Sequence, residues 1–192
     1  MVASRPRRSQ SASAALTTDA ASDRDAISAL VYTYAERLDA GDLAGVATLF
    51  RHATFRSDRR PEVRRGRKEV LRVFTETVAL YDGKPCTQHV TTNLIIEVNA
   101  AAGRAAARSK FTVLQARPEL PLQVILSGRY HDRFARGPRG WRFTDRLILV
   151  DLIGDLRFHL KSDPFAPSRE TRGTLVRGRK RGRFLRTGRP RP

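Results

Sequence analysis

Four consecutive strand-like segments, joined by short turns, constrain the fold of this chain more than any other feature. They span Thr87–Asn99, Ala105–Ala116, Leu122–Ala135 and Trp141–Leu152. Apolar and polar residues alternate within them, as in strands with one buried face. In the third segment, alternation predicts one inward face: Leu122, Val124, Leu126, Tyr130 and Phe134. Because short turns join antiparallel neighbours, we expect an antiparallel meander.

Helical periodicity dominates the chain before these strands. We expect a first helix with Ser22 as its N-cap and Gly41 at its end. Its apolar stripe consists of Ile27, Leu30, Val31, Tyr34 and Leu38. Asp42 is the expected cap of a second, short helix, and a third helix is predicted over Arg67–Tyr81. Between them, Ala53–Ser57 is a candidate strand, and residues 58–66 read as a basic loop.

Helices followed by a meander predict an α+β domain in which a curved antiparallel sheet wraps around the N-terminal helices, as a cone-shaped α+β barrel. We place this domain at residues 22–160. Residues 1–21 are predicted to be a disordered basic segment, and residues 161–192 a disordered Arg-rich tail.

The formal net charge of +18 is concentrated in the tail, because residues 161–192 hold eleven Lys or Arg residues against two acidic ones. Such a tail predicts weak, non-specific contact with nucleic acid or an anionic surface. The alternative is a solvated tail without a partner, since no nucleic-acid-binding module accompanies it.

The composition of the chain argues against a disulfide, a transmembrane segment and a metal site. The single cysteine, Cys86, excludes an intrachain disulfide, which fits a reducing, cytoplasmic location. No apolar run approaches the roughly 18 residues that predict a transmembrane segment. The four histidines are scattered without the spacing of a metal site. We therefore expect neither a metal nor a cofactor.

Two polar side chains stand out on the first predicted helix. Tyr34 lies within the apolar stripe, and Asp39 lies in the last turn, where the helix dipole disfavours a carboxylate. Asp39 either helps to terminate the helix or has a function. We favour function, because Asp42 already supplies the cap of the next helix.

Three separated segments resemble one known family: YTYAERLDAGDLAGVATLF, TQHVTTN and GRYHDRFARGPRGWRFTDRLILVDLIGD. They are similar to the SnoaL-like branch of the nuclear transport factor 2-like superfamily. That superfamily includes scytalone dehydratase, ketosteroid isomerase, bile-acid dehydratases and the small subunits of ring-hydroxylating dioxygenases. The resemblance implies a cone whose open mouth forms a pocket.

The resemblance also implies roles for individual residues. Asp39 and His89 fall on the catalytic aspartate and histidine of the dehydratases, and Tyr34 resembles a helix tyrosine that donates a hydrogen bond to a substrate oxygen. Tyr130 falls near an oxyanion-hole residue of the isomerase, and Arg146 near a pocket arginine of the bile-acid dehydratases. We thus expect Asp39, His89 and Tyr34 to be catalytic.

Substrate binding is expected of Tyr130, Arg146 and Phe55, the last from the first strand. Each of two residues has an alternative interpretation. Phe55 is equally compatible with an ordinary core residue, and Arg146 with a surface ion pair to Asp145, Asp151 or Asp155.

Two departures from the family pattern stand out. The base aspartate of the isomerase maps near Ser57 or Asp58, and the second histidine of scytalone dehydratase has no counterpart in Ala105–Ala116.

The predicted function is that of a cofactor-free lyase or isomerase of the dehydratase type, acting in polyketide or steroid metabolism. An Asp–His pair would transfer a proton on a hydrophobic, carbonyl-bearing ring substrate. The alternative is a non-catalytic small-molecule-binding or assembly module, including a partner that resembles a dioxygenase small subunit. In either case the open sheet face predicts a homo-oligomer, a dimer or a trimer.

Overall fold

A curved sheet and three helices make up the described part of the protein. The computed structural model describes residues 9–161, and side chains from residue 21 onward. The helices are α1 (Ser9–Asp39), α2 (Leu43–Leu49) and α3 (Gly66–Thr77). The strands are β1 (Thr54–Ser57), β2 (Arg60–Arg65), β3 (Thr87–Asn99), β4 (Arg104–Arg117), β5 (Leu120–Gly137) and β6 (Gly140–Ile153). The predicted α+β class with N-terminal helices and a curved sheet is confirmed.

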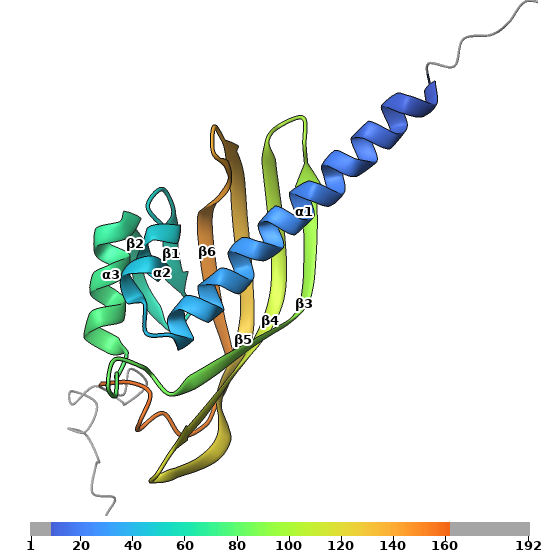
Figure 1. Ribbon diagram of the computed structural model, residues 1–192. Coiled ribbons are helices and arrows are strands. Elements are labelled where there is room, and N and C mark those ends of the chain that lie inside the picture. The colour runs from blue at the N-terminus through green and yellow to red at the C-terminus, as the bar shows by residue number, and fades with distance from the viewer. Residues whose placement is uncertain (1–8, 162–192) are drawn as a thin grey trace, which may run out of the picture.

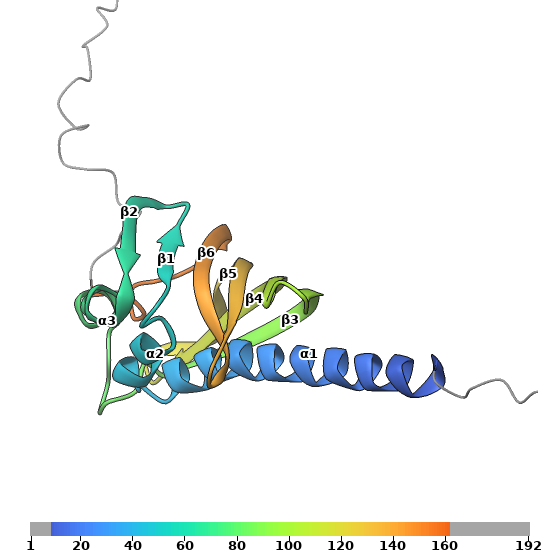
Figure 2. The ribbon, with the colours of Figure 1, turned by 90° about the horizontal axis from the view of Figure 1, so that it is seen from above.

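The six strands form one sheet in the order β2-β1-β6-β5-β4-β3. Strands β3 to β6 form the predicted antiparallel meander, and β1 joins it parallel to β6. The sheet curves without closing, and α1 lies across one of its faces, while α2 and α3 lie toward β1 and β2 (Figures 1 and 2). This arrangement encloses the core between α1 and the concave face of the sheet.

The predicted apolar stripe of α1 faces this core. Ile27, Val31, Tyr34 and Leu38 are buried, and Leu30 packs against them from a partly buried position. The sheet contributes the inward side chains of β4, from Ala105 to Val113, as the alternation predicted. Packing of the stripe, rather than helix propensity alone, fixes where α1 lies.

α1 begins at Ser9, so the predicted N-cap at Ser22 is wrong. The sequence from Ser9 to Ala40 contains no Gly or Pro, and its alanines favour helix. Asp23 is therefore an interior residue of the helix, and its carboxylate accepts a hydrogen bond from Trp141 Nε1 at 2.9 Å. Residues 1–8 and 162–192, which include almost all of the predicted basic tail and its proposed anionic contacts, lie outside the described residues.

The predicted basic loop is in fact a strand, β2, which pairs antiparallel with β1. Five of its six residues are exposed. An edge strand tolerates such charged, solvated side chains and also Pro61, because one side of its backbone has no strand neighbour. Neither alternation nor apolar content marks a strand of this kind.

The predicted inward face of the third segment is wrong in its first half. Leu122 and Val124 are 70% and 52% exposed, whereas Ile125 is buried. A register shift between Val113 and Leu114 in the β4–β5 pairing accounts for the difference. Such a bulge exchanges the two faces of a strand, so Leu126, Tyr130 and Phe134 point inward as predicted, whereas Leu122 and Val124 do not.

Within residues 9–161, no helix is both long enough and apolar enough to cross a membrane. Strands β3, β5 and β6 expose several large apolar side chains: Val90, Ile95, Leu122, Val124, Leu152 and Ile153. The homo-oligomer that the sequence predicts stays a prediction.

Candidate active site

The local sequence around the end of α1 places the Asp39 carboxylate toward the sheet. Asp39 is the last residue of the helix, and Gly41 follows at φ +80°, a conformation suited to glycine. Asp42 caps α2 as predicted, by accepting a hydrogen bond from Gly45 N at 2.8 Å. The two aspartates of the DAGD sequence therefore have different roles: Asp42 caps α2, and Asp39 faces β3.

Residues of β3 surround the Asp39 carboxylate with hydrogen-bond donors. His89 Nδ1 lies 2.6 Å from Asp39 Oδ1, and the His89 backbone N–H donates to Oδ2 at 2.7 Å. Thr87 Oγ1 donates to Oδ1 at 2.8 Å. Thr87 and His89 are two residues apart, so both side chains point to the same face of the strand. These donors offset the unfavourable position of a carboxylate at a helix C-terminus.

The same contacts favour the ionised form of Asp39. Partial burial opposes ionisation, but the hydrogen bonds and charge of His89, helped by the Thr87 hydroxyl, lower the pKa of Asp39 below its ordinary value. Since Nδ1 of His89 is engaged with this carboxylate, a neutral ring presents the lone pair of Nε2 for proton transfer.

His89 lies on the wall of a partly open cavity of about 180 Å³ on the inner side of the sheet, called the inner cavity below. Its lining is mainly apolar and comes from several elements: Tyr34 and Leu38 from α1, Phe55 from β1, Phe74 from α3, Val78 just after α3, Phe111 and Val113 from β4, Leu126 and Tyr130 from β5, and Ile148 from β6. Arg59, in the turn between β1 and β2, and Arg60, the first residue of β2, also line it. The cavity thus combines an apolar wall with few polar groups, as small-molecule sites do.

Tyr34 and Tyr130 bring two phenols to the cavity. Both are 3% exposed, and their ring centroids are 5.8 Å apart. Tyr130 also stacks on Phe111, with 4.4 Å between centroids. Burial raises the pKa of both phenols, well above the ordinary value for Tyr130, so both are neutral hydrogen-bond donors.

Arg146 lies behind these two phenols and not on the cavity wall. Its side chain is fully buried and forms a bidentate pair with Asp132, with Nε–Oδ1 at 2.8 Å and Nη2–Oδ2 at 2.7 Å. The guanidinium carbon is 4.2 Å from the ring centroid of each tyrosine. The surface ion pair with Asp145, Asp151 or Asp155, considered from the sequence, is wrong. Arg146 instead supports the rings from within the core.

Burial and mutual attraction act in opposite directions on the Asp132–Arg146 pair. Burial raises the pKa of Asp132, but the Arg146 guanidinium opposes this effect. Burial likewise works against the charge of Arg146, yet the Asp132 carboxylate raises its pKa above the ordinary value. Two parallel N–H···O hydrogen bonds are the geometry of a strong charge-assisted pair.

The first strand places Phe55 on the cavity wall, where it also packs edge-on against Phe50 and Phe74. Ser57 lines the cavity as well. Asp58 is engaged elsewhere, since its carboxylate accepts the Val150 N–H at 3.1 Å. Of the two residues that the resemblance matches to the isomerase base, Ser57 thus carries a hydroxyl on the cavity wall and Asp58 a carboxylate that binds backbone.

Sequence reasoning missed three polar residues around this cavity. Thr87 was recognisable from its spacing to His89, and Asp132 from its shared parity with Tyr130 and Phe134 on one strand face. His159 also lines the cavity, but it follows the last strand, in a segment without periodicity, so no pattern marked it.

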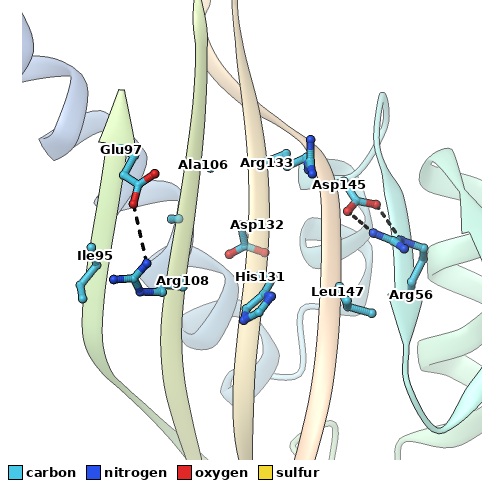
Figure 3. A pocket seen from close by; sticks show the side chains of 11 residues that line it. Arg56, Ile95, Glu97, Ala106, Arg108, His131, Asp132, Arg133, Asp145 and Leu147 are labelled. Atoms are coloured by element: carbon cyan, nitrogen blue, oxygen red, sulfur yellow. Dashed lines mark hydrogen bonds and ion pairs between the residues drawn. The ribbon is translucent and has the colours of Figure 1, made fainter. Parts of the chain in front are cut away.

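Larger hollows of about 440 and 540 Å³ lie on the outer face of the sheet. In the first, Arg56 pairs with Asp145 at 2.5 Å and Arg108 with Glu97 at 3.7 Å, and His131 projects from β5 (Figure 3). Exposed charges of both signs line this face, and neither Asp39 nor His89 reaches it. Despite its smaller volume, the inner cavity is the better candidate site.

The comparisons with known proteins agree with the fold. The SnoaL-like domain profile matches residues 19–147. No curated protein sequence matches the chain significantly. Among solved structures, an NTF2-like protein with a cystatin-like fold from Novosphingobium aromaticivorans superposes with a TM-score of 0.62 at 17% identity, covering 76% of this chain and 92% of the other.

Two further structures from N. aromaticivorans have the same fold. A candidate scytalone dehydratase has a TM-score of 0.59 at 21% identity and covers 72% of this chain and 91% of its own. The beta subunit of a candidate aromatic-ring-hydroxylating dioxygenase has a TM-score of 0.58 at 16% identity, covering 73% and 97%. At these identities the likeness concerns the fold.

Proposed function

Because the chain belongs to the SnoaL-like domain family, we propose that its inner cavity is the active site of a lyase or isomerase that uses side chains alone. The observation that carries this proposal is the 2.6 Å contact between Asp39 and His89 at the wall of an apolar cavity. The substrate class is a hydrophobic ring compound with a carbonyl group, since the lining is mainly apolar and offers neutral phenol donors.

His89 is the base in this proposal. Its Nε2 takes a proton from the carbon next to the substrate carbonyl, and the C–H electron pair moves to form an enolate. Asp39 holds the ring through Nδ1 and stabilises the imidazolium that forms. Return of the proton to another carbon completes an isomerisation, and loss of a neighbouring hydroxyl completes a dehydration. General acid–base help of this kind contributes roughly 10²–10⁴-fold to the rate.

Tyr34 and Tyr130 donate hydrogen bonds to the developing enolate oxygen. Preorganised donors in a water-poor site stabilise such charge effectively. Arg146 is a positioning residue, because it contacts the two rings but does not line the cavity. Its buried charge also favours negative charge on the oxygen that the phenols bind.

The test uses 2-tetralone, a bicyclic ketone with an acidic C–H beside its carbonyl. In D₂O the wild-type protein should accelerate exchange of the C1 hydrogens above the buffer rate, as measured by proton NMR. His89→Ala should lose this acceleration, whereas His131→Ala, on the outer face, should retain it. Equal exchange by wild type and His89→Ala would contradict the proposal.

A second candidate function is that of an assembly module, which the exposed apolar side chains of the sheet favour. In that case the protein copurifies from its native host with an iron-bearing large subunit. It then also leaves 2-tetralone exchange at the buffer rate.

A further inference from the structure

His159 is a second imidazole in the cavity, and it comes from the segment that follows β6. It is 6% exposed, and its Nδ1 is buried without a hydrogen-bond partner among the described residues. Buried polar atoms of side chains are normally paired, and an unpaired one needs an explanation. His159 and His89 line the same cavity, so the His159 ring lies within reach of a ligand there.

The chain holds His159 in place through backbone and side-chain hydrogen bonds. The Ala79 N–H donates to the His159 carbonyl at 2.9 Å, next to the end of α3. The neighbouring Phe158 carbonyl accepts from Gln115 Nε2 at 2.9 Å and from Tyr81 Oη at 3.0 Å. These hydrogen bonds fix the backbone at His159, and its buried Nδ1 has no hydrogen-bond partner within the part of the chain that the structure describes.

Strand register places this ring at the same end of the cavity as the Asp39–His89 pair. Gln115, which binds the segment, pairs with Thr87, two residues from His89. Tyr130 instead pairs with Ser109, further along β4. The cavity thus has one polar end with two imidazoles and another with two phenols.

The environments of the two imidazoles differ. His89 is hydrogen-bonded to a carboxylate, whereas burial, followed by the charge of His89, lowers the pKa of His159 to about 4 against a weaker opposing effect of Asp39. His159 is therefore neutral near pH 7, with one N–H donor and one lone-pair acceptor. A hydroxyl group both donates and accepts, so it matches this ring in either tautomer.

We infer that His159 is a further substrate-binding residue, and that it holds a hydroxyl on the ring carbon beside the C–H bond that His89 breaks. This inference rests on the proposed function and narrows it to a lyase. His89 takes the proton, the C–H electron pair forms the C=C bond, and the C–O bond breaks. The leaving hydroxide takes the proton from His89 and departs as water, so no oxidant or reductant is needed.

The experiment compares 2-tetralone with 4-hydroxy-2-tetralone, which gives 2-naphthol on loss of water and enolisation. Fluorescence of 2-naphthol reports dehydration after subtraction of the buffer rate, and deuterium exchange of 2-tetralone reports proton abstraction alone. His159→Phe should lower kcat/KM for dehydration about tenfold and change exchange by less than about twofold, as for one lost hydrogen bond. His159→Gln, which keeps a donor and an acceptor, should recover part of the dehydration rate.

Other outcomes separate the inference from the proposed function. If His159→Phe lowers both reactions equally, or neither, His159 is a core residue and the inference is wrong. His131→Gln is the matched control and should leave both reactions unchanged. If wild type catalyses neither reaction, the proposed function fails. The affinities of the protein for the two ketones then decide whether His159 binds the hydroxyl group. About fivefold tighter binding of the hydroxyketone, lost in His159→Phe, supports the contact, and equal binding overturns it.

Discussion

Two carboxylate–base pairs differ in their place relative to the cavity that Tyr34 and Tyr130 line. Asp39 and His89 join the end of α1 to β3 at the cavity, and the Asp39 side chain is 21% exposed. Asp132 and Arg146 join neighbouring strands, and their side chains are 1% and 0% exposed. The first pair reaches a space that a ligand can enter, whereas the second reaches only core. Location relative to the cavity, rather than pair chemistry, therefore separates a proton-transfer role from a supporting one.

The same Asp→Asn substitution at both acids tests this difference. Asp39→Asn removes the charge that stabilises the His89 imidazolium but keeps an acceptor for the β3 donors. We expect 2-tetralone exchange to fall roughly 10²–10⁴-fold, with the melting temperature within a few degrees of wild type. Exchange near the wild-type rate would show that Asp39 only terminates its helix.

Asp132→Asn should act mainly on stability. It leaves the fully buried Arg146 charge without a carboxylate, and breaking such a pair typically costs about 3–5 kcal/mol. Urea unfolding measures this loss, and the double variant Asp132→Leu/Arg146→Met should recover much of it, since no charge stays unpaired. If Asp132→Asn unfolds like wild type but loses exchange activity, the buried pair takes part in the chemistry directly.

The dependence of stability on pH distinguishes buried His159 from the Asp39–His89 pair. The folded pKa of His159 is about 4 and its ordinary value is 6.5, so between these pH values the unfolded chain binds the extra proton. Stability from the neutral, buried ring is complete above pH 6.5 and falls by about 3 kcal/mol toward pH 4. Asp39 has a lowered pKa, so its contribution is lost only below its ordinary value of 3.8.

His159→Phe should flatten this part of the stability profile, measured as urea midpoints at several pH values. His131→Phe, on the exposed outer face, is the control and should leave the slope unchanged. An unchanged slope in His159→Phe would show that other groups control acid sensitivity and that the His159 ring is accessible to protons when folded.

Much of this arrangement follows from sequence periodicity. Alternation locates β3 to β6, because each has a buried face, and the apolar stripe locates the packed half of α1. The contact between Asp39 and His89 follows from two features, a carboxylate at the wrong end of a helix and a family resemblance. Their catalytic role stays a prediction.

The remaining features depend on contacts that leave no local pattern. β2 is a strand because β1 lies beside it, and its residues Arg60–Arg65 are nearly all polar. The pair between Asp132 and Arg146 requires the β5–β6 register, in which these residues lie opposite each other. His159 reaches the cavity through hydrogen bonds to its backbone and to that of Phe158, which no side-chain periodicity encodes.

The smallest expected effect concerns how the Asp39 carboxylate is held. Thr87→Val keeps the shape of the side chain and removes one donor at 2.8 Å, while both His89 contacts remain. Exchange of 2-tetralone should fall about fivefold, the value of one modest hydrogen bond. Losing this donor also raises the pKa of Asp39 toward its ordinary value, so the acid limb of the pH–rate profile should move to higher pH. Thr92→Val, on the exposed face of the same strand, should change neither quantity. A loss as large as that of Asp39→Asn would mean that Thr87, and not the His89 backbone, sets the orientation of the carboxylate.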